Sequence, residues 1–157
     1  MVQEHIFKQF DADLEAVRSR VLQMGGMVEE QIGKAVEALN SGNIDLADEV
    51  LANDHRVNAL EVGIDEDCVH FIARRQPTAG DLRIVMMIVK TITDLERIGD
   101  EAAKIARMAK LIHEGNRLSL PRFTEIKTMS TLVLEMLSKS LDSFARLEPT
   151  AAAHIAR

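Results

Sequence analysis

Residues 74–83 read Arg-Arg-Gln-Pro-Thr-Ala-Gly-Asp-Leu-Arg, and this stretch decides the fold because it interrupts two long helical patterns. Pro77 and Gly80 break the chain, since proline restricts the residue before it and both residue types are unfavourable inside a helix. Asp81 is a suitable N-cap for the helix that follows. The stretch therefore predicts a helical hairpin whose second helix spans about 81–113.

The helix before this turn is predicted over about 44–75, and two acidic residues interrupt its apolar seam. The residues that recur on one side are Ala47, Val50, Asp54, Val57, Glu61, Ile64, Cys68 and Phe71. Asp54 and Glu61 thus occupy positions that should be apolar in a packed helix. The helix after the turn carries a broader apolar face, which implies that it packs on more than one neighbour.

A first helix is predicted over about 4–39, because apolar residues follow one stripe from Phe7 to Val28. The polar residues 40–43 then end it. Gly25 and Gly26 lie inside this helix and cost about 1 kcal/mol each relative to alanine. Packing against neighbouring helices must therefore hold the first helix together.

A fourth helix is predicted after residue 115, with Pro121 in its first turn. Glu148-Pro149-Thr150 stops it, and residues 151–157 look like the beginning of a fifth helix. Helices of about 30 residues are roughly 45 Å long, and short loops make neighbours antiparallel. The sequence predicts an all-α, elongated antiparallel bundle.

Composition supports this fold class and excludes several functions. The 157 residues are 46% hydrophobic, contain neither Trp nor Tyr, and carry a formal net charge of -6. The acidic balance, with no basic run longer than Arg74-Arg75, argues against nucleic acid as a partner. No apolar stretch approaches the roughly 20 residues that cross a bilayer, and the single Cys68 suits a reducing compartment. A cytoplasmic protein is expected.

Two acidic pairs of the form E-x-x-x-D need an explanation: Glu61 with Asp65, and Glu96 with Asp100. Like charges one turn apart repel on a helix, so a bundle gains nothing from them unaided. Glu61 lies 15 residues before Gln76, and Glu96 lies 15 residues after Asp81. Both are about 22 Å from the turn, so antiparallel helices bring them to the same level.

In this register Asp100 falls near Asn58, so four carboxylates and an amide oxygen gather within about one turn. Oxygen ligands suit hard cations such as Mg, Mn, Ca or iron, whereas clustered Cys and His for a zinc site are absent. The metal ligands predicted are Glu61, Asp65, Glu96 and Asp100. The alternative is that Arg97 and Lys104 neutralise these carboxylates and no metal binds.

Machinery for catalysis is not visible in the sequence. There is no phosphate-cradling glycine loop, no nucleophile elbow and no Ser/His/Asp set. A ferritin-like di-iron site needs two Glu-x-x-His motifs, and this chain has none. The histidines are scattered and are expected at the surface.

Two segments carry a specific resemblance to the PhoU family. The first is Arg74 to Arg83, and the second is Asp94-Leu95-Glu96-Arg97-Ile98-Gly99-Asp100-Glu101-Ala102. The combination of an R-Q-P-x-x-x-D-L-R turn and a D-L-E-R-I-G-D helix resembles that family. The resemblance covers the whole chain, with residues 1–115 similar to the family's first three-helix repeat and residues 116–157 to the start of its second.

The resemblance implies a fold of two similar three-helix bundles, in which E-x-x-x-D motifs bind multinuclear clusters of iron or other divalent metals. It also implies a non-enzymatic negative regulator of phosphate uptake and phosphate-starvation signalling. The implied partners are a Pst-type ABC phosphate transporter and a PhoR-type sensor histidine kinase. Members are expected to be cytoplasmic homodimers that meet the membrane only through these partners.

One departure from the family pattern is the missing second D-L-E-R-I-G-D-like helix, since the sequence stops at Arg157. A fragment and a shortened member are both compatible with this. In either case the fourth helix lacks its repeat partners, and oligomerisation is expected to cover its apolar surface.

The preferred hypothesis is a signalling adaptor with a metal-binding acidic site. One rival is a metal-dependent enzyme that uses the carboxylate cluster, which would need a substrate pocket and an open coordination position. The other rival is a purely structural helical module whose carboxylates bind nothing.

Overall fold

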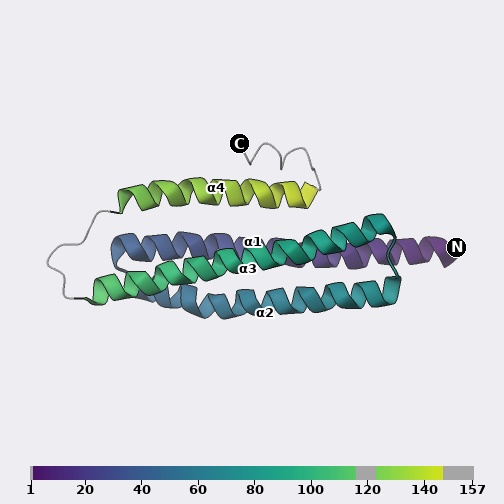
Figure 1. Cartoon of the computed structure of the whole chain (residues 1–157), viewed down its shortest axis with the longest axis horizontal. Coiled ribbons are helices and arrows are strands. Elements are labelled where there is room, and N and C mark those ends of the chain that lie inside the picture. The colour runs from purple at the N-terminus through teal and green to yellow at the C-terminus, as the bar shows by residue number, and fades with distance from the viewer. Residues whose placement is uncertain (1, 116–122, 147–157) are drawn as a thin grey trace.

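The computed structural model describes residues 2–115 and 123–146, with side chains from Ala12 onward, and this part of the chain is helical without strands. The helices are α1 (Val2–Ser41), α2 (Ile44–Arg75), α3 (Ala79–Glu114) and α4 (Thr124–Arg146). Figure 1 shows them as long rods whose axes are nearly aligned. The all-α, elongated antiparallel architecture is confirmed.

The helices α1, α2 and α3 form one three-helix bundle, because each of them contacts the other two. Their facing sides supply a continuous apolar core, and the seam predicted for α2 is buried from Ala47 to Phe71 with the exception of Glu61. On α3 the buried positions include Gly99 and the alanines at 102, 103, 106 and 109. Small residues let α3 approach its neighbours closely along this half.

The helix α4 lies outside this bundle. It packs against α1 alone among the described helices, and Figure 1 places it on the side of α1 that is opposite to α2. Leu137 and Ser143 are its buried residues. The helical spacing predicted for α4 is present, but a single neighbour covers only part of its apolar side.

Gly25 explains how α4 comes close to α1. A Cβ atom built on Gly25 would lie 2.5 Å from Leu141 Cδ2, so the missing side chain makes the space that Leu141 occupies. Nothing lies within 4 Å of the corresponding position on Gly26. Farther along the contact, the Arg18 guanidinium donates a hydrogen bond to the carbonyl oxygen of Ala145. Packing of Leu141 therefore compensates the helix-propensity cost of Gly25, whereas no such contact is present at Gly26.

The turn between α1 and α2 is held from the far end of α3. Gly42 adopts a φ of 74° and Asn43 caps α2, its Oδ1 accepting a hydrogen bond from Leu46 N at 3.3 Å. His113 Nε2 donates to the carbonyl oxygen of Leu39 at 2.8 Å, and its ring lies against Gly42. The expectation that every histidine lies at the surface is wrong for the half-buried His113.

The turn between α2 and α3 differs from its prediction in one detail. Thr78, in an extended conformation, is the N-cap of α3, so the prediction that Asp81 is the N-cap is wrong. Asp81 lies in the first turn, where its Oδ2 accepts a hydrogen bond from Thr78 Oγ1 at 2.5 Å. A carboxylate there is favourable because the helix N-terminus carries partial positive charge.

Some predicted features lie outside the described residues. These are Pro121 in the first turn of the fourth helix, the Glu148-Pro149-Thr150 stop, and the start of a fifth helix over 151–157. Within the described helices, none is both long enough and apolar enough to span a membrane.

Candidate functional site

The predicted register between α2 and α3 can be followed at Gly99. A Cβ atom built there would lie 3.5 Å from Val57 Cγ1, so Gly99 faces the α2 turn that starts at Val57. In antiparallel helices this alignment brings Glu96, three residues earlier, level with Glu61. The charges of these two carboxylates also act on each other across the two helices.

Among the four predicted carboxylates, Glu61 is the one whose ionised form this arrangement disfavours. It is half-buried on α2 at a position that the helical pattern reserves for apolar residues. Burial raises the pKa of Glu61 above its ordinary value, and the charges of Glu96 and Asp65 raise it further. Both causes disfavour the ionised carboxylate, so a positive charge at this place would stabilise it.

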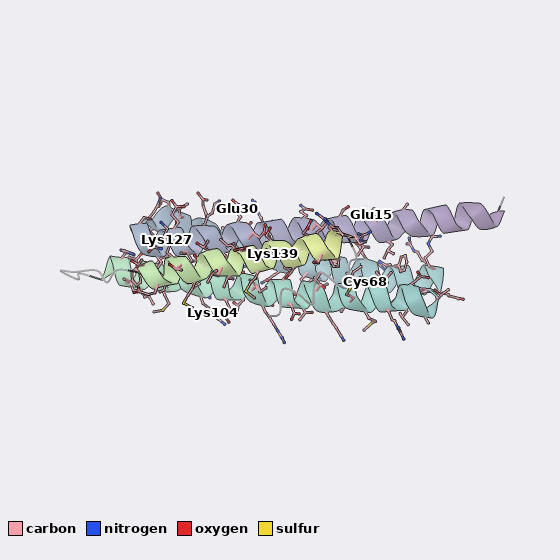
Figure 2. The ribbon with its side chains drawn as sticks, turned by 90° about the horizontal axis from the view of Figure 1, so that it is seen from above. Glu15, Glu30, Cys68, Lys104, Lys127 and Lys139 are labelled. Carbon is pink, nitrogen blue, oxygen red and sulfur yellow. The ribbon has the colours of Figure 1, made fainter. Side chains whose placement is uncertain are left out.

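The other two predicted residues lie closer to solvent. Asp65 is exposed on α2, one turn after Glu61. Asp100 on α3 is partly exposed, and its Oδ2 lies 3.1 Å from Lys104 Nζ. Lys104 also binds Glu101 Oε1 at 2.8 Å, and the hydrogen bonds with Glu101 and Asp100 raise the pKa of Lys104. Figure 2 places Lys104 at the edge of the molecule opposite to Glu30.

The structure thus places Glu96 and Asp65 where their charges act on Glu61, and it gives Asp100 a lysine partner. Neutralisation by Lys104, the alternative weighed above, therefore applies to one of the four carboxylates. The side chains of Lys104 and Asp100 are 52% and 42% exposed, so the ion pair between them is weak and exchangeable.

A buried polar layer, made of Gln31, Asp54 and Asn58, lies at the same level of the bundle. Gln31 is 1% exposed, and its Nε2 donates to Asp54 Oδ1 at 3.2 Å. Its Oε1 would be 3.3 Å from a Cβ atom on Gly99, which identifies the side of α3 that it faces. In the part of the chain that the structure describes, Gln31 Oε1 and Asn58 Oδ1 have no hydrogen-bond partner.

Sequence reasoning had placed Asn58 near Asp100 and Asp54 in the seam, but it missed Gln31. The signal was present, because Gln31 follows Val28 by three residues and continues the apolar stripe of α1. A polar residue in such a stripe must find a partner inside the bundle. Gln31 finds one in Asp54, so these two polar positions explain each other.

The chemistry of this layer is that of oxygen donors. Carboxylate and amide oxygens suit hard cations, so the donor set fits the class of metal that the sequence predicts. Over residues 12–115 and 123–146, however, no three Asp, Glu, His or Cys side chains converge closely enough to hold a metal ion. The residues therefore fit a cation by chemistry and by electrostatic need, while their side chains do not converge on one point.

Cys68 lies on the same helix but does not belong to this layer. The thiol is buried, and burial, followed by the charges of Asp65 and Asp67, raises the pKa of Cys68 to about 11. A thiol with such a pKa stays protonated near neutral pH and is a poor nucleophile or metal ligand. The burial of Cys68 agrees with its predicted place in the apolar seam.

Comparison with known proteins places the chain beside one family. The family model described as "PhoU domain" matches residues 21–109. Over 154 residues the chain is 46% identical to the "Phosphate-specific transport system accessory protein PhoU" of Escherichia coli (strain K12). That match covers 98% of this chain and 63% of the relative, so the chain spans less than two thirds of that protein's length.

Solved structures agree with the sequence comparison. The crystal structure of PhoU from Pseudomonas aeruginosa superposes with a TM-score of 0.87 at 44% identity, over 92% of this chain and 69% of that one. The phosphate transport system regulatory protein PhoU from Streptococcus pneumoniae gives a TM-score of 0.83 at 32% identity, over 94% and 68% of the two chains. The bundle described above is therefore the bundle of these proteins.

Proposed function

This chain belongs to the PhoU family, and on that premise we propose that it regulates phosphate uptake as an accessory protein of a Pst-type ABC phosphate transporter. The observation that carries this proposal is the 46% identity, over nearly the whole chain, to a protein named as an accessory of the phosphate-specific transport system. The match to the family model over residues 21–109 supports it independently.

The finer parts of the proposal follow from the same family membership. The protein restrains the transporter and a PhoR-type sensor histidine kinase when phosphate is plentiful, and it does so in the cytoplasm as a homodimer without being an enzyme. The net charge of -6 and the absence of a basic run support a protein rather than nucleic acid as the partner.

A complementation experiment tests this function. The chain would be expressed in a bacterium that lacks its own PhoU protein, and a reporter of phosphate starvation would be measured in phosphate-rich medium. We expect the chain to lower reporter activity towards the wild-type level. Reporter activity that stays as high as with an empty vector, although the chain is present and folded, would contradict the proposed function.

We further propose that the carboxylates Glu61, Asp65, Glu96 and Asp100 bind metal ions of the divalent or iron type, in a structural or regulatory role. The raised pKa of Glu61 supports this, since a cation is the simplest way to stabilise a half-buried carboxylate beside Glu96. A bound cation would replace Lys104 as the partner of Asp100, at little cost because that ion pair is exposed.

Elemental analysis of the purified protein tests the metal proposal. We expect bound metal in the wild type and its loss when Glu96→Ala and Asp100→Ala are combined. The matched control combines Asp45→Ala and Glu49→Ala, because these residues form another acidic i, i+4 pair on α2 away from this site. Equal metal contents in all three proteins would remove the metal proposal and leave the regulatory one standing.

A further inference from the structure

The two halves of α3 carry different charges on their outer side. Residues 82–93 include two basic residues, Arg83 and Lys90, and no acidic residue. In the second half, Lys104 is held by carboxylates of its own helix at 2.8 and 3.1 Å. Within the part of the chain that the structure describes, Arg83 and Lys90 make no such ion pair, and both side chains are exposed. Both cations are therefore free to bind carboxylates of another molecule.

Three large apolar side chains lie beside these two cations. Leu82, Met86 and Met87 are 39%, 47% and 39% exposed. Together with Arg83 and Lys90 they line a shallow hollow of about 630 Å³ on α3, and these five residues form the α3 patch. Methionine side chains are flexible and polarisable, so the hollow can adapt to the side chains of a second protein. Exposed apolar residues that gather at one place are typical of an interaction surface.

The α3 patch points away from the other helices of the bundle. Lys90 lies two residues from the buried Ile88 and two from the buried Ile92, which places it on the opposite side of the helix. Arg83, seven residues before Lys90, lies on the same line along α3. The groove that α3 shares with α4 begins beside this line, at Thr91. Figure 1 shows that the described part of α4 stops short of the α2–α3 turn, near which the patch lies.

The chemistry of the α3 patch indicates what binds there. Arg83 and Lys90 are two helical turns apart, or about 10 Å along the axis. A helix with an acidic residue at every seventh position presents carboxylates at the same spacing, and apolar residues beside them would fill the hollow. A flat surface of anionic lipid would also meet the exposed Asp94 and Glu101, which repel it. A single helix can cover the patch without covering these two carboxylates.

We propose that the α3 patch is the docking site of an acidic amphipathic helix from a protein partner. Arg83 and Lys90 bind two carboxylates of that helix, while Leu82, Met86 and Met87 contact its apolar residues. The inference rests on the proposed function, in which the chain acts through a protein partner. It adds the surface on this chain and the chemistry of the partner segment.

A peptide-binding experiment with the full chain tests the charge complementarity. The probe is a fluorescein-labelled helical peptide of about 20 residues, with glutamate at every seventh position and leucines beside the glutamates. Fluorescence anisotropy should show binding to the wild type. Arg83→Glu combined with Lys90→Glu should raise the dissociation constant at least about tenfold, since two attractions become repulsions.

The matched control combines Arg56→Glu with Arg107→Glu. These exposed residues lie away from the α3 patch, and their substitution changes the net charge by the same amount. The control protein should bind the peptide as the wild type does. Met86→Ser combined with Met87→Ser should weaken binding about tenfold without any change of charge, because the apolar contact is lost. Circular dichroism should show the same helix content in all variants, since every substituted side chain is exposed.

A reciprocal exchange tests the pairing itself. A second peptide, with lysine in place of each glutamate, should not bind the wild type and should bind the protein that carries Arg83→Glu and Lys90→Glu. A glutamate peptide that does not bind, or that binds all variants equally, would overturn the docking site. Vesicles of phosphatidylglycerol are the third probe. Wild-type protein that binds these vesicles but not the glutamate peptide would overturn the inference in favour of a membrane surface.

The complementation assay separates this inference from the proposed function. We expect the wild-type chain to lower reporter activity and the protein with Arg83→Glu and Lys90→Glu to lose this effect. If both proteins lower reporter activity equally, the regulatory function stands and the α3 patch is not its docking site. If the wild type itself has no effect, the proposed function is contradicted, and the peptide measurement still decides whether the patch binds an acidic helix.

Discussion

The helices α2 and α4 both pack on α1, yet they are stabilised very differently. Helix α2 lies between α1 and α3 and buries an apolar seam from Ala47 to Phe71. Helix α4 has an equally regular apolar pattern but, among the described helices, it packs on α1 alone, and five of its large apolar side chains stay exposed. The comparison teaches that an amphipathic pattern gives the direction in which a helix packs, whereas the number of neighbours determines how much it buries.

The largest expected effect separates the two environments directly. Ile92→Ala removes a side chain that is 1% exposed in the three-helix core and should lower the free energy of unfolding by about 2–5 kcal/mol. Ile126→Ala on α4, where the side chain is 38% exposed, should lower it by less than about 1 kcal/mol. Urea unfolding followed by circular dichroism measures both. Equal losses would show that α4 is as firmly enclosed as the core.

A smaller effect should detach α4 without disturbing the bundle. Gly25→Leu places a side chain where Leu141 now lies, and overpacking of this kind costs about 1–3 kcal/mol. Hydrogen exchange should become faster along α4 and remain slow in α2 and α3, because those helices do not depend on this contact. The measurement is amide exchange followed by mass spectrometry.

Gly26→Ala is the counterpart to that experiment. Nothing lies within 4 Å of the added Cβ atom, so the substitution should raise the free energy of unfolding by up to about 1 kcal/mol through helix propensity alone. A destabilised Gly26→Ala protein, seen in the same urea titration, would mean that this side of α1 is covered in solution.

The smallest effect concerns Glu61, the half-buried glutamate in the seam of α2. The pKa of Glu61 in the folded protein is above its ordinary value of 4.5, so the folded state holds this proton more tightly than the unfolded chain. The contribution of Glu61 to stability is therefore fully present below pH 4.5 and is lost as the pH rises through the folded-state pKa.

Glu61→Gln should consequently raise the free energy of unfolding near pH 7 by a few tenths of a kcal/mol, about the cost of one like-charge pair on a helix. It should also flatten the decline of stability between pH 4.5 and pH 7. The free energy of unfolding would be measured by thermal unfolding at several pH values, on protein treated with a chelator. Glu66→Gln, an exposed glutamate of the same helix, serves as the control. An identical pH profile for wild type and Glu61→Gln would contradict the assigned burial.

Much of the fold could be predicted because capping and helix-breaking residues mark the ends of the helices. The α2 range 44–75 was predicted without error, since Asn43 and Pro77 mark its two limits. Apolar surface on α4 was expected from its missing repeat partners, but its pattern does not tell which residues are exposed, because Val133 and Ile126 follow the same spacing as the buried Leu137. The predicted division into residues 1–115 and 116–157 stays a prediction.

The candidate site was predictable in register but not in detail. Counting residues from the turn was sufficient to align Glu61 with Glu96, because helical rise is constant. The ion pair between Asp100 and Lys104 was weighed only as an alternative, since spacing alone does not tell which neighbour a flexible side chain prefers. The roles of the four carboxylates as metal ligands stay a prediction that elemental analysis will decide.

The contact of His113 with the α1–α2 turn makes the two ends of the bundle unequal. The backbone at Leu39 and Gly42 is tied to α3 by a side chain from far along the sequence. At the other end, the backbone of the α2–α3 turn is closed by local bonds, such as that from Gln76 N to the carbonyl oxygen of Ile72, and the adjacent Arg75 side chain donates to Asp13 Oδ2 of α1 at 2.6 Å. A fluorescent label or an inserted epitope should therefore be tolerated at Thr78 and should disrupt the protein at Gly42.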